Sequence, residues 1–137
     1  MYVHVPFCAR VCPYCDFAVE AAPELLRGGD EAFRAREARY LAALLSELER
    51  RAPDFAGRRL ATLYFGGGTP GLLRPDSLAR VREAVLSRFA PDPSGVETTL
   101  EINPSTVERE RLRAFRLEAG IDRLSICLLY TSDAADE

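Results

Sequence analysis

Hydrophobic positions along the chain follow two different periods, and each period predicts one kind of secondary structure. Short runs rich in apolar, β-branched and aromatic residues are typical of strands; they lie at residues 1–5, 60–65, 96–102 and 121–126. Between these runs, apolar residues recur at helical spacing and predict helices over residues 30–52, 75–89 and 105–119. Residues 18–29, with Pro23, Gly28 and Gly29, are predicted to form a loop.

The order of these elements predicts the fold class. Strands that alternate with helices indicate an α/β domain whose parallel strands are joined by right-handed crossovers. Such a sheet is either open and doubly wound or part of a barrel, and in both cases ligands bind at the carboxyl ends of the strands. Three unusual segments follow predicted strands, at residues 7–17, at "GGGTP" (66–70) and at "EINP" (101–104). We therefore expect these segments to converge on one edge of the sheet.

The composition narrows the classes of protein and of partner. A chain of 137 residues with 47% hydrophobic and 28% charged residues has the size and makeup of one globular domain. The net charge is −3, all 18 basic residues are arginine, and no basic stripe indicates a nucleic-acid partner. No apolar run approaches the roughly 18–20 residues of a membrane span, and no signal peptide precedes the first strand. We therefore expect a cytoplasmic protein without a membrane span.

The final segment, "CLLYTSDAADE" at residues 127–137, differs in character from the rest of the chain. It carries acidic side chains and no arginine, whereas the preceding residues are balanced in charge. The string resembles the conceptual translation of an adaptor used in preparing sequencing libraries; the alternative is a native, poorly ordered tail. We therefore divide the chain into a truncated core domain, residues 1–126, and an appended segment, residues 127–137, that is excluded from fold reasoning.

Three of the four cysteines crowd into "FCARVCPYC", and the fourth is Cys127. Because disulfides are rare in cytosolic chains, such a cluster of thiols is more typical of a metal site. The spacing is Cys8-x3-Cys12-x2-Cys15. Three thiolates from one loop suit three corners of a [4Fe–4S] cluster and leave the fourth iron open to another ligand. The alternative is a structural zinc site that is completed by His4 or Cys127.

The spacing Cys-x3-Cys-x2-Cys after a first strand, with the aromatic Tyr14 just before the last cysteine, resembles the radical SAM superfamily. The resemblance implies that Cys8, Cys12 and Cys15 bind a [4Fe–4S] cluster whose open iron chelates S-adenosylmethionine (SAM). In that family the reduced cluster cleaves SAM to a 5′-deoxyadenosyl radical, which abstracts hydrogen from a substrate. The fold of the family is a partial (β/α)6 barrel of parallel strands, and the chain is expected to supply the N-terminal half of that barrel.

Two further segments have counterparts in the same family. "GGGTP" looks like the segment that binds the methionine end of SAM, which implies that role for Gly66, Gly67, Gly68 and Thr69. Glycines after a strand also fit an ordinary strand-to-helix turn. Glu101 matches a glutamate that contacts SAM in similar proteins, and a solvated charge at the end of a strand is the alternative.

Two tyrosines flank the cysteine motif. Tyr2 and Tyr14 are placed to pack on the cluster or on the adenine of SAM, and simple core aromatics are the alternative. His4 is expected to be a packed or substrate-facing strand residue rather than a metal ligand. No residue of the chain is assigned a catalytic role.

The run "YVHVPFC…CPYCDF…YFGGGTP…LEINP…GIDRLSI" is similar to one branch of the superfamily, that of oxygen-independent coproporphyrinogen III oxidase and the haem chaperone HemW. The oxidase has a further cysteine two positions after the third ligand, and this chain has Phe17 at that place. This difference favours a HemW-type protein over the oxidase. The branch implies a tetrapyrrole partner, haem or coproporphyrinogen III, and a flavodoxin- or ferredoxin-type electron donor. Its members continue beyond "RLSI", so the chain is expected to be a fragment that is inactive by itself.

Overall fold

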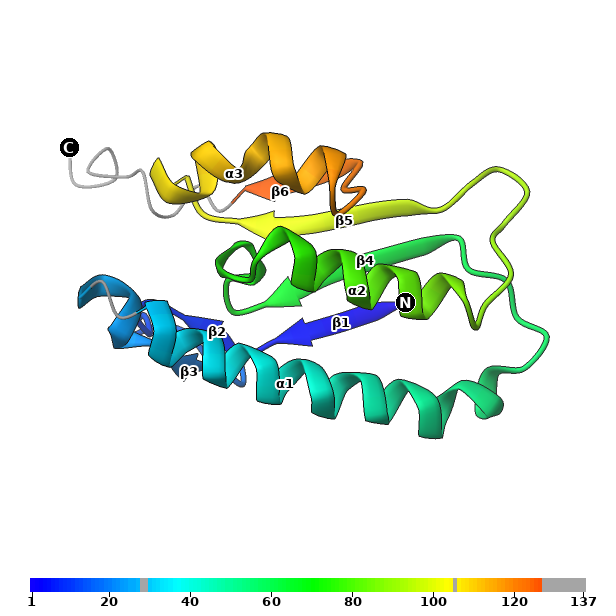
Figure 1. Cartoon of the computed structure of the whole chain (residues 1–137), viewed down its shortest axis with the longest axis horizontal. Helices are drawn as coiled ribbons and strands as arrows, with labels where there is room; N and C mark the ends of the chain where they lie inside the picture. The colour runs from blue at the N-terminus through cyan, green and yellow to red at the C-terminus, as the bar shows by residue number, and fades with distance from the viewer. Residues whose placement is uncertain (28–29, 105, 127–137) are drawn as a thin grey trace.

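A computed structural model describes residues 1–27, 30–104 and 106–126 of the chain (Figure 1). The strands are β1 (Tyr2–Val5), β2 (Phe7–Cys8), β3 (Glu20–Ala21), β4 (Thr62–Gly67), β5 (Glu97–Ile102) and β6 (Arg123–Ile126). The α-helices are α1 (Asp30–Arg51), α2 (Pro75–Leu86) and α3 (Thr106–Leu117). Short 3-10 helices are η1 (Pro23–Arg27), η2 (Ala52–Phe55) and η3 (Pro70–Leu72). No helix in the described part is both long and apolar enough to cross a membrane.

Within the described residues, a parallel sheet has the strand order β1-β4-β5-β6. Tyr2 lies opposite Tyr64, Tyr64 opposite Thr99, and Thr99 opposite Arg123 in successive ladders. Each pair of neighbours in this sheet is joined through an α-helix, as parallel pairing requires. The predicted α/β fold class with a parallel sheet is confirmed.

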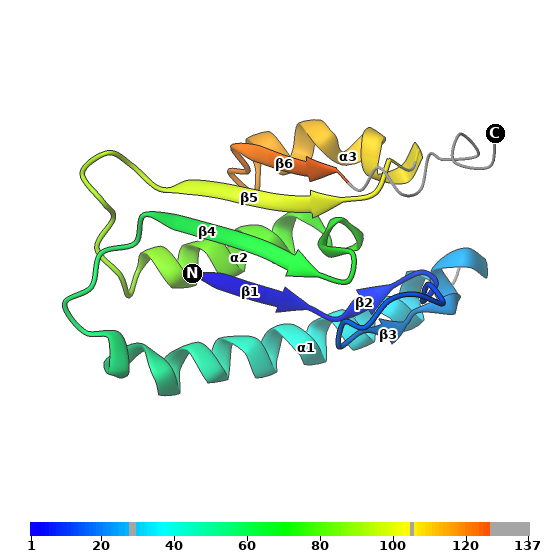
Figure 2. The same cartoon turned by 180° about the vertical axis from the view of Figure 1, so that it is seen from behind.

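Helices α1, α2 and α3 all lie against one face of the sheet, and Figure 2 shows the opposite face without a helix in the described part of the chain. Successive side chains of a strand point to opposite faces, so each strand divides its residues between the two. The helix-covered face and the helices that pack on it form the core, whose buried residues include Val3, Val5, Leu63, Phe65, Leu78, Val81, Val85, Phe89, Leu100 and Phe115. Polar and aromatic side chains at Tyr2, His4, Tyr64 and Glu101 alternate with these core residues and belong to the open face.

The segment predicted as loop, residues 18–29, contains regular structure in its described part. It forms β3 and η1. The Glu20 N–H donates to the Pro6 carbonyl at 2.7 Å, and the Ala22 N–H donates to the Cys8 carbonyl at 2.7 Å. A pair of two-residue strands has no periodicity along the sequence, which is why the pattern did not reveal it.

Other boundaries shift by a few residues. Strand β4 runs on through Gly66 and Gly67, which the pattern places after the end of the strand. Helices α2 and α3 end before residues 89 and 119. Gly120, predicted to follow the third helix, has a φ of +64°, a conformation that favours glycine. Ser105 with Glu108 three residues later matches a capping box at the start of the third predicted helix. Residue 105, the side chain of Glu108 and the segment 127–137 lie outside the part of the chain that the structure describes.

A buried carboxylate fixes the beginning of α2. Glu37 of α1 is 1% exposed, and its two oxygens accept hydrogen bonds from the Arg74 N–H at 2.8 Å and from Arg74 Nε at 3.3 Å. Arg74 comes directly before Pro75, the first residue of α2. The helix therefore has its first backbone donor satisfied by a side chain from another helix. This contact ties α1 to the segment that follows the glycines of β4.

Replacing Glu37 by alanine is expected to reduce the free energy of unfolding by about 2–4 kcal/mol, because it removes a buried carboxylate together with both of its hydrogen bonds to Arg74. Glu37→Gln keeps one acceptor oxygen for the backbone N–H, so a smaller loss is expected. The measurement is urea-induced unfolding, with Glu31→Ala on the exposed face of α1 as the control. A loss for Glu37→Ala no larger than that of the control would contradict this role.

Candidate cofactor site

The cysteine loop, residues 8–20, leaves the carboxyl end of β1 and returns beside its own beginning. At its base β2 and β3 pair in parallel, with Phe7 opposite Glu20 and Cys8 opposite Ala21. Figures 1 and 2 show this small pair just beyond the carboxyl end of β1, next to the first turns of α1. The loop is therefore closed by backbone hydrogen bonds at the edge of the sheet where the sequence predicts the site.

Arg36 of α1 holds the returning end of the loop. Its guanidinium donates to the Ala21 carbonyl at 3.1 Å and forms ion pairs with Glu20 at 2.7 Å and Glu24 at 2.5 Å. The same group lies 5.3 Å from the centre of the Phe7 ring. Because the arginine side chain is mostly buried, these contacts are screened less by solvent than a surface pair would be. The helix thus positions both ends of the cysteine loop.

A turn inside the loop brings two of its cysteines close in space. The Cys15 N–H donates to the Cys12 carbonyl at 3.1 Å, with Pro13 and Tyr14 between them. Proline at this position of a turn is favoured because its φ is already set. Cys8, Cys12 and Cys15 are free, partly exposed thiols, and the Tyr14 side chain is 66% exposed.

Cys8 lies against the segment that follows β4. The Thr69 hydroxyl donates to Cys8 Sγ at 3.8 Å, and a Cβ at Gly68 would lie 2.9 Å from that sulfur. Burial raises the pKa of the Cys8 thiol, the Thr69 hydroxyl lowers it, and the charges of Cys15 and Cys12 raise it. Negative charge on Cys12 and Cys15 therefore disfavours the Cys8 thiolate, and a cationic group bound between the three sulfurs would relieve this repulsion.

This donor set fits an iron–sulfur cluster. Among the described residues, no group of three or more His, Cys, Asp or Glu side chains converges closely enough to hold one metal ion. A cubane does not require such convergence, because each thiolate binds a different iron. For the zinc alternative, Cys127 lies outside the described residues, and the other candidate ligand, His4, has both ring nitrogens in hydrogen bonds.

A second group of side chains gathers around Glu101 on the open face of the sheet. Its Oε1 accepts a hydrogen bond from the Tyr64 hydroxyl at 2.7 Å, and its Oε2 accepts one from the Gly67 N–H at 3.1 Å. The rings of Tyr2 and Tyr64 stack with centroids 6.1 Å apart. A Cβ at Gly66 would lie 2.9 Å from both tyrosine rings and 3.1 Å from Glu101 Oε2. The structure thus brings Tyr2, Gly66, Gly67 and Glu101 together.

His4 links this group to the cysteine loop. The Ala18 carbonyl accepts a hydrogen bond from His4 Nε2 at 2.7 Å, so that nitrogen carries the proton. In the neutral ring Nδ1 is then an acceptor for the Tyr2 hydroxyl, at 3.2 Å. The ring packs on Gly67, whose Cβ would lie 2.7 Å from it. One imidazole therefore contacts the tyrosine, the loop and the glycine strand at once.

Three contacts at the site were not assigned from the sequence. Tyr64, which binds Glu101, lies two residues before Gly66 on the same strand, so strand periodicity places both on one face. Asn103 follows β5 and donates to the Thr69 hydroxyl at 3.2 Å, and its place after a strand end was the available signal. The carbonyl of Ala18 carries no side-chain signal and could not be found from the pattern.

Residues 2–134 match the family described as "Radical SAM superfamily". The chain belongs to this superfamily. It is 34% identical to the haem chaperone HemW of Escherichia coli (strain K12) over 126 residues, which are 92% of this chain and 30% of that protein. It is 39% identical over 133 residues to the mitochondrial radical S-adenosyl methionine domain-containing protein 1 of Bos taurus, covering 97% of this chain and 27% of that protein.

A solved structure shows the same fold. Coproporphyrinogen III oxidase (HemN) from Escherichia coli, described as a radical SAM enzyme, matches with a TM-score of 0.74 and 32% identity over 91% of this chain and 26% of that one. This radical SAM chain therefore belongs to the group that contains HemN and HemW, and it spans less than a third of the length of these relatives. Identity to HemW and to the oxidase is nearly equal, so the group is shown and the individual member is not. Because one relative is mitochondrial, the cytoplasmic compartment stays a prediction.

Gly67→Ala is expected to reduce the free energy of unfolding by about 3 kcal/mol or more, because its backbone is strained for a side chain and the new Cβ would meet His4. The matched control is Gly57→Ala: both glycines have positive φ, +115° and +80°, but a Cβ at Gly57 meets nothing within 4 Å. That control is expected to cost only about 1 kcal/mol. Urea-induced unfolding measures both, and equal losses would show that the close approach to His4 does not matter.

Proposed function

We propose that this radical SAM chain forms the cluster- and SAM-binding part of a HemW-type haem chaperone. The observation that carries the proposal is the contact between the cysteine loop and the end of β4, where Cys8 meets Gly68 and Thr69. Cys8, Cys12 and Cys15 would hold a [4Fe–4S] cluster. When bound, the cluster supplies one-electron cleavage of the SAM sulfonium, the chemistry of the superfamily.

The residues around the cysteine loop are proposed to bind and orient SAM beside the cluster. Gly66, Gly67 and Gly68 keep the strand end free of Cβ atoms, so that a ligand can approach the backbone closely. Glu101 has two of its acceptor sites occupied, by Tyr64 and by the Gly67 N–H. A carboxylate has about four lone-pair sites, so Glu101 still has sites for the ammonium or hydroxyl donors of SAM.

Tyr2 and Thr69 support this arrangement from two sides, and Tyr14 belongs to the cysteine loop. The partly exposed Tyr2 ring stacks beside Tyr64 and offers a flat surface toward the open face, where an adenine is expected. The Thr69 hydroxyl receives a hydrogen bond from Asn103 and donates toward Cys8. The exposed Tyr14 is proposed to pack on the bound cofactors from the cysteine loop.

The HemW-type assignment depends on Phe17, which occupies the place of the additional cysteine of the oxidase and is 69% exposed in the cysteine loop. Haem is then the expected tetrapyrrole partner, and a flavodoxin- or ferredoxin-type protein the expected electron donor. The alternative function is oxidative decarboxylation of coproporphyrinogen III, as in the oxidase that shares the fold. The test uses the longer protein of which this chain is expected to be a part. Haem binding by that protein without turnover of coproporphyrinogen III supports the chaperone, and decarboxylation by it supports the oxidase.

Anaerobic reconstitution with iron and sulfide is expected to load about four irons per chain. Cys12→Ala removes one of the three proposed ligands, so the iron content of the chain is expected to fall to background. Cys127→Ala is the matched control, because Cys127 has no place in the proposed ligand set, and it is expected to load normally. Analysis of iron, sulfide and zinc measures the outcome. One zinc per chain and no iron would decide for the zinc site instead.

Glu101→Ala is expected to weaken SAM binding by at least about tenfold, since hydrogen bonds to charged groups contribute roughly 1.5–3 kcal/mol. Its iron content should stay at the wild-type value. Glu97→Ala is the control: Glu97 lies on the same strand and face, where it pairs with Arg123 at 3.3 Å. Equilibrium binding of SAM to the reconstituted proteins measures the difference. Equal affinity of the two variants would remove Glu101 from the SAM site.

A further inference from the structure

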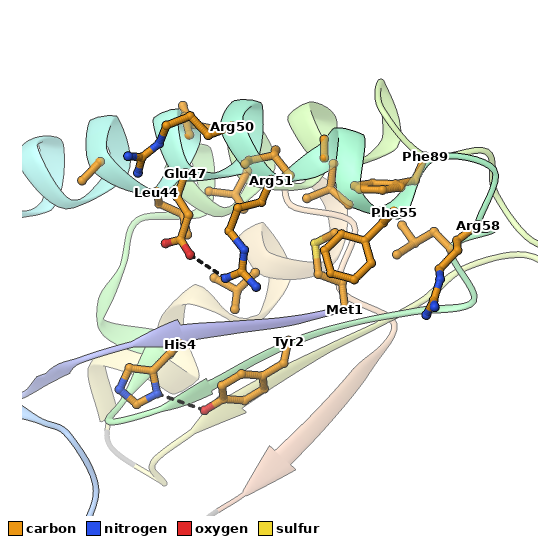
Figure 3. A pocket seen from close by; sticks show the side chains of 18 of the residues that line it. Met1, Tyr2, His4, Leu44, Glu47, Arg50, Arg51, Phe55, Arg58 and Phe89 are labelled. Atoms are coloured by element: carbon orange, nitrogen blue, oxygen red, sulfur yellow. Dashed lines mark hydrogen bonds and ion pairs between the residues drawn. The ribbon is translucent and has the colours of Figure 1, made fainter.

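A groove of about 830 Å³ lies between the second half of α1 and the edge strand β1, away from the cysteines (Figure 3). Its size falls in the range that holds small organic ligands, roughly 300–1,000 Å³. Much of its lining is apolar and comes from four parts of the chain: Met1, Ala43, Leu44, Leu48, Ala52, Phe55, Leu60, Val81, Val85 and Phe89. Several of these side chains belong to the core, so the groove reaches from the surface into the interior.

The charged residues that line the groove are mostly of one sign. Arg50, Arg51, Arg58 and Arg59 line it, and Glu47 is the acidic residue among the lining residues. Figure 3 shows Arg51 extending from α1 toward β1, and Arg58 at the end of the groove. An apolar floor beside several guanidinium groups is complementary to a ligand with an apolar body and a carboxylate.

The present contacts of Arg51 and Arg58 leave these two side chains available to a ligand. Arg51 pairs with Glu47 at 2.8 Å, but both side chains are about half exposed or more, and such a pair contributes little to stability. The Arg58 guanidinium lies 5.7 Å from the centre of the Phe55 ring. This contact uses the face of the guanidinium and leaves the N–H donors of Arg58 for other acceptors. A carboxylate in the groove can therefore bind both guanidinium groups without breaking a buried contact.

We propose that this groove binds an amphipathic carboxylate with a broad, flat apolar body, of the class of the porphyrin dicarboxylates. The aromatic rings of Phe55 and Phe89 and the thioether of Met1 line the same space, and they favour a π-system over a single alkyl chain. A fatty acid also combines a carboxylate with an apolar body and is the competing candidate for the ligand. The choice of a tetrapyrrole rests on the proposed function. The groove would place this tetrapyrrole apart from the cluster.

Fluorescence titration of the full chain with zinc protoporphyrin IX tests the site. Saturable binding is expected, and the double variant Arg51→Gln/Arg58→Gln is expected to bind at least about tenfold more weakly. Ala43→Trp places a bulky ring in the groove and is expected to abolish binding. Arg39→Gln, on the exposed face of the same helix, should bind as the wild type does. Wild-type affinity in both the double variant and Ala43→Trp would overturn the proposal.

Two further ligands test the chemistry of recognition. Protoporphyrin IX dimethyl ester keeps the ring but lacks both carboxylates, so it is expected to bind at least about tenfold more weakly than protoporphyrin IX itself. Equal affinity of the ester would overturn the role of the arginines. Oleate is expected to compete poorly. Arginine-dependent binding of oleate without binding of porphyrin would overturn the choice of a tetrapyrrole.

Tyr2 and His4 line the groove and also belong to the proposed SAM site, but no cysteine lines the groove, so removing the cluster still tests the groove by itself. Cys12→Ala, without a cluster, is expected to bind zinc protoporphyrin IX as the wild type does. Loss of porphyrin binding in that variant would place the ligand at the cluster site and overturn this inference. If instead the wild type forms no cluster but shows the arginine-dependent binding, the proposed function fails and the groove assignment stands.

Discussion

The absence of side chains at three successive glycines is the constraint on which the site depends. Gly66 lies under two tyrosine rings and a carboxylate, Gly67 lies under the His4 ring, and Gly68 lies under Cys8 Sγ. At each of the three glycines a Cβ would come within 3 Å of at least one of these neighbouring groups. Because the end of the strand carries no side chains, three parts of the site pack directly on its backbone: the tyrosines with Glu101, the His4 ring and Cys8. A single added methyl group would push one of them away from the others.

The sequence predicted the large elements and the convergence of the unusual segments at one edge of the sheet, because both depend on patterns that repeat along the chain. The convergence of the cysteine loop with the ends of β4 and β5 follows from parallel pairing alone, and the contact of Thr69 with Cys8 agrees with it. The contacts that complete the site were missed for a physical reason. The bond from Tyr64 to Glu101 and the one from Arg74 to Glu37 each join residues 37 apart, and no local pattern marks such partners.

Helix α1 organises most of what surrounds the site. Within little more than one turn, Arg36 holds the cysteine loop, Glu37 holds the beginning of α2, and the Tyr40 hydroxyl donates to the His4 carbonyl at 2.7 Å. Burial raises the pKa of Tyr40, so this hydroxyl keeps its proton and remains a donor. Helix α1 therefore positions the cysteine loop, the strand that bears His4 and the segment after the glycines. The second half of the same helix borders the groove.

The exclusive use of arginine has a consequence for that groove. A guanidinium stays protonated at every pH at which the protein is folded, whereas a lysine beside an apolar surface readily loses its charge. The four arginines that line the groove therefore keep their positive charge as the pH changes. The attraction of a guest to these guanidinium groups would depend on the guest's own ionisation and on the salt concentration.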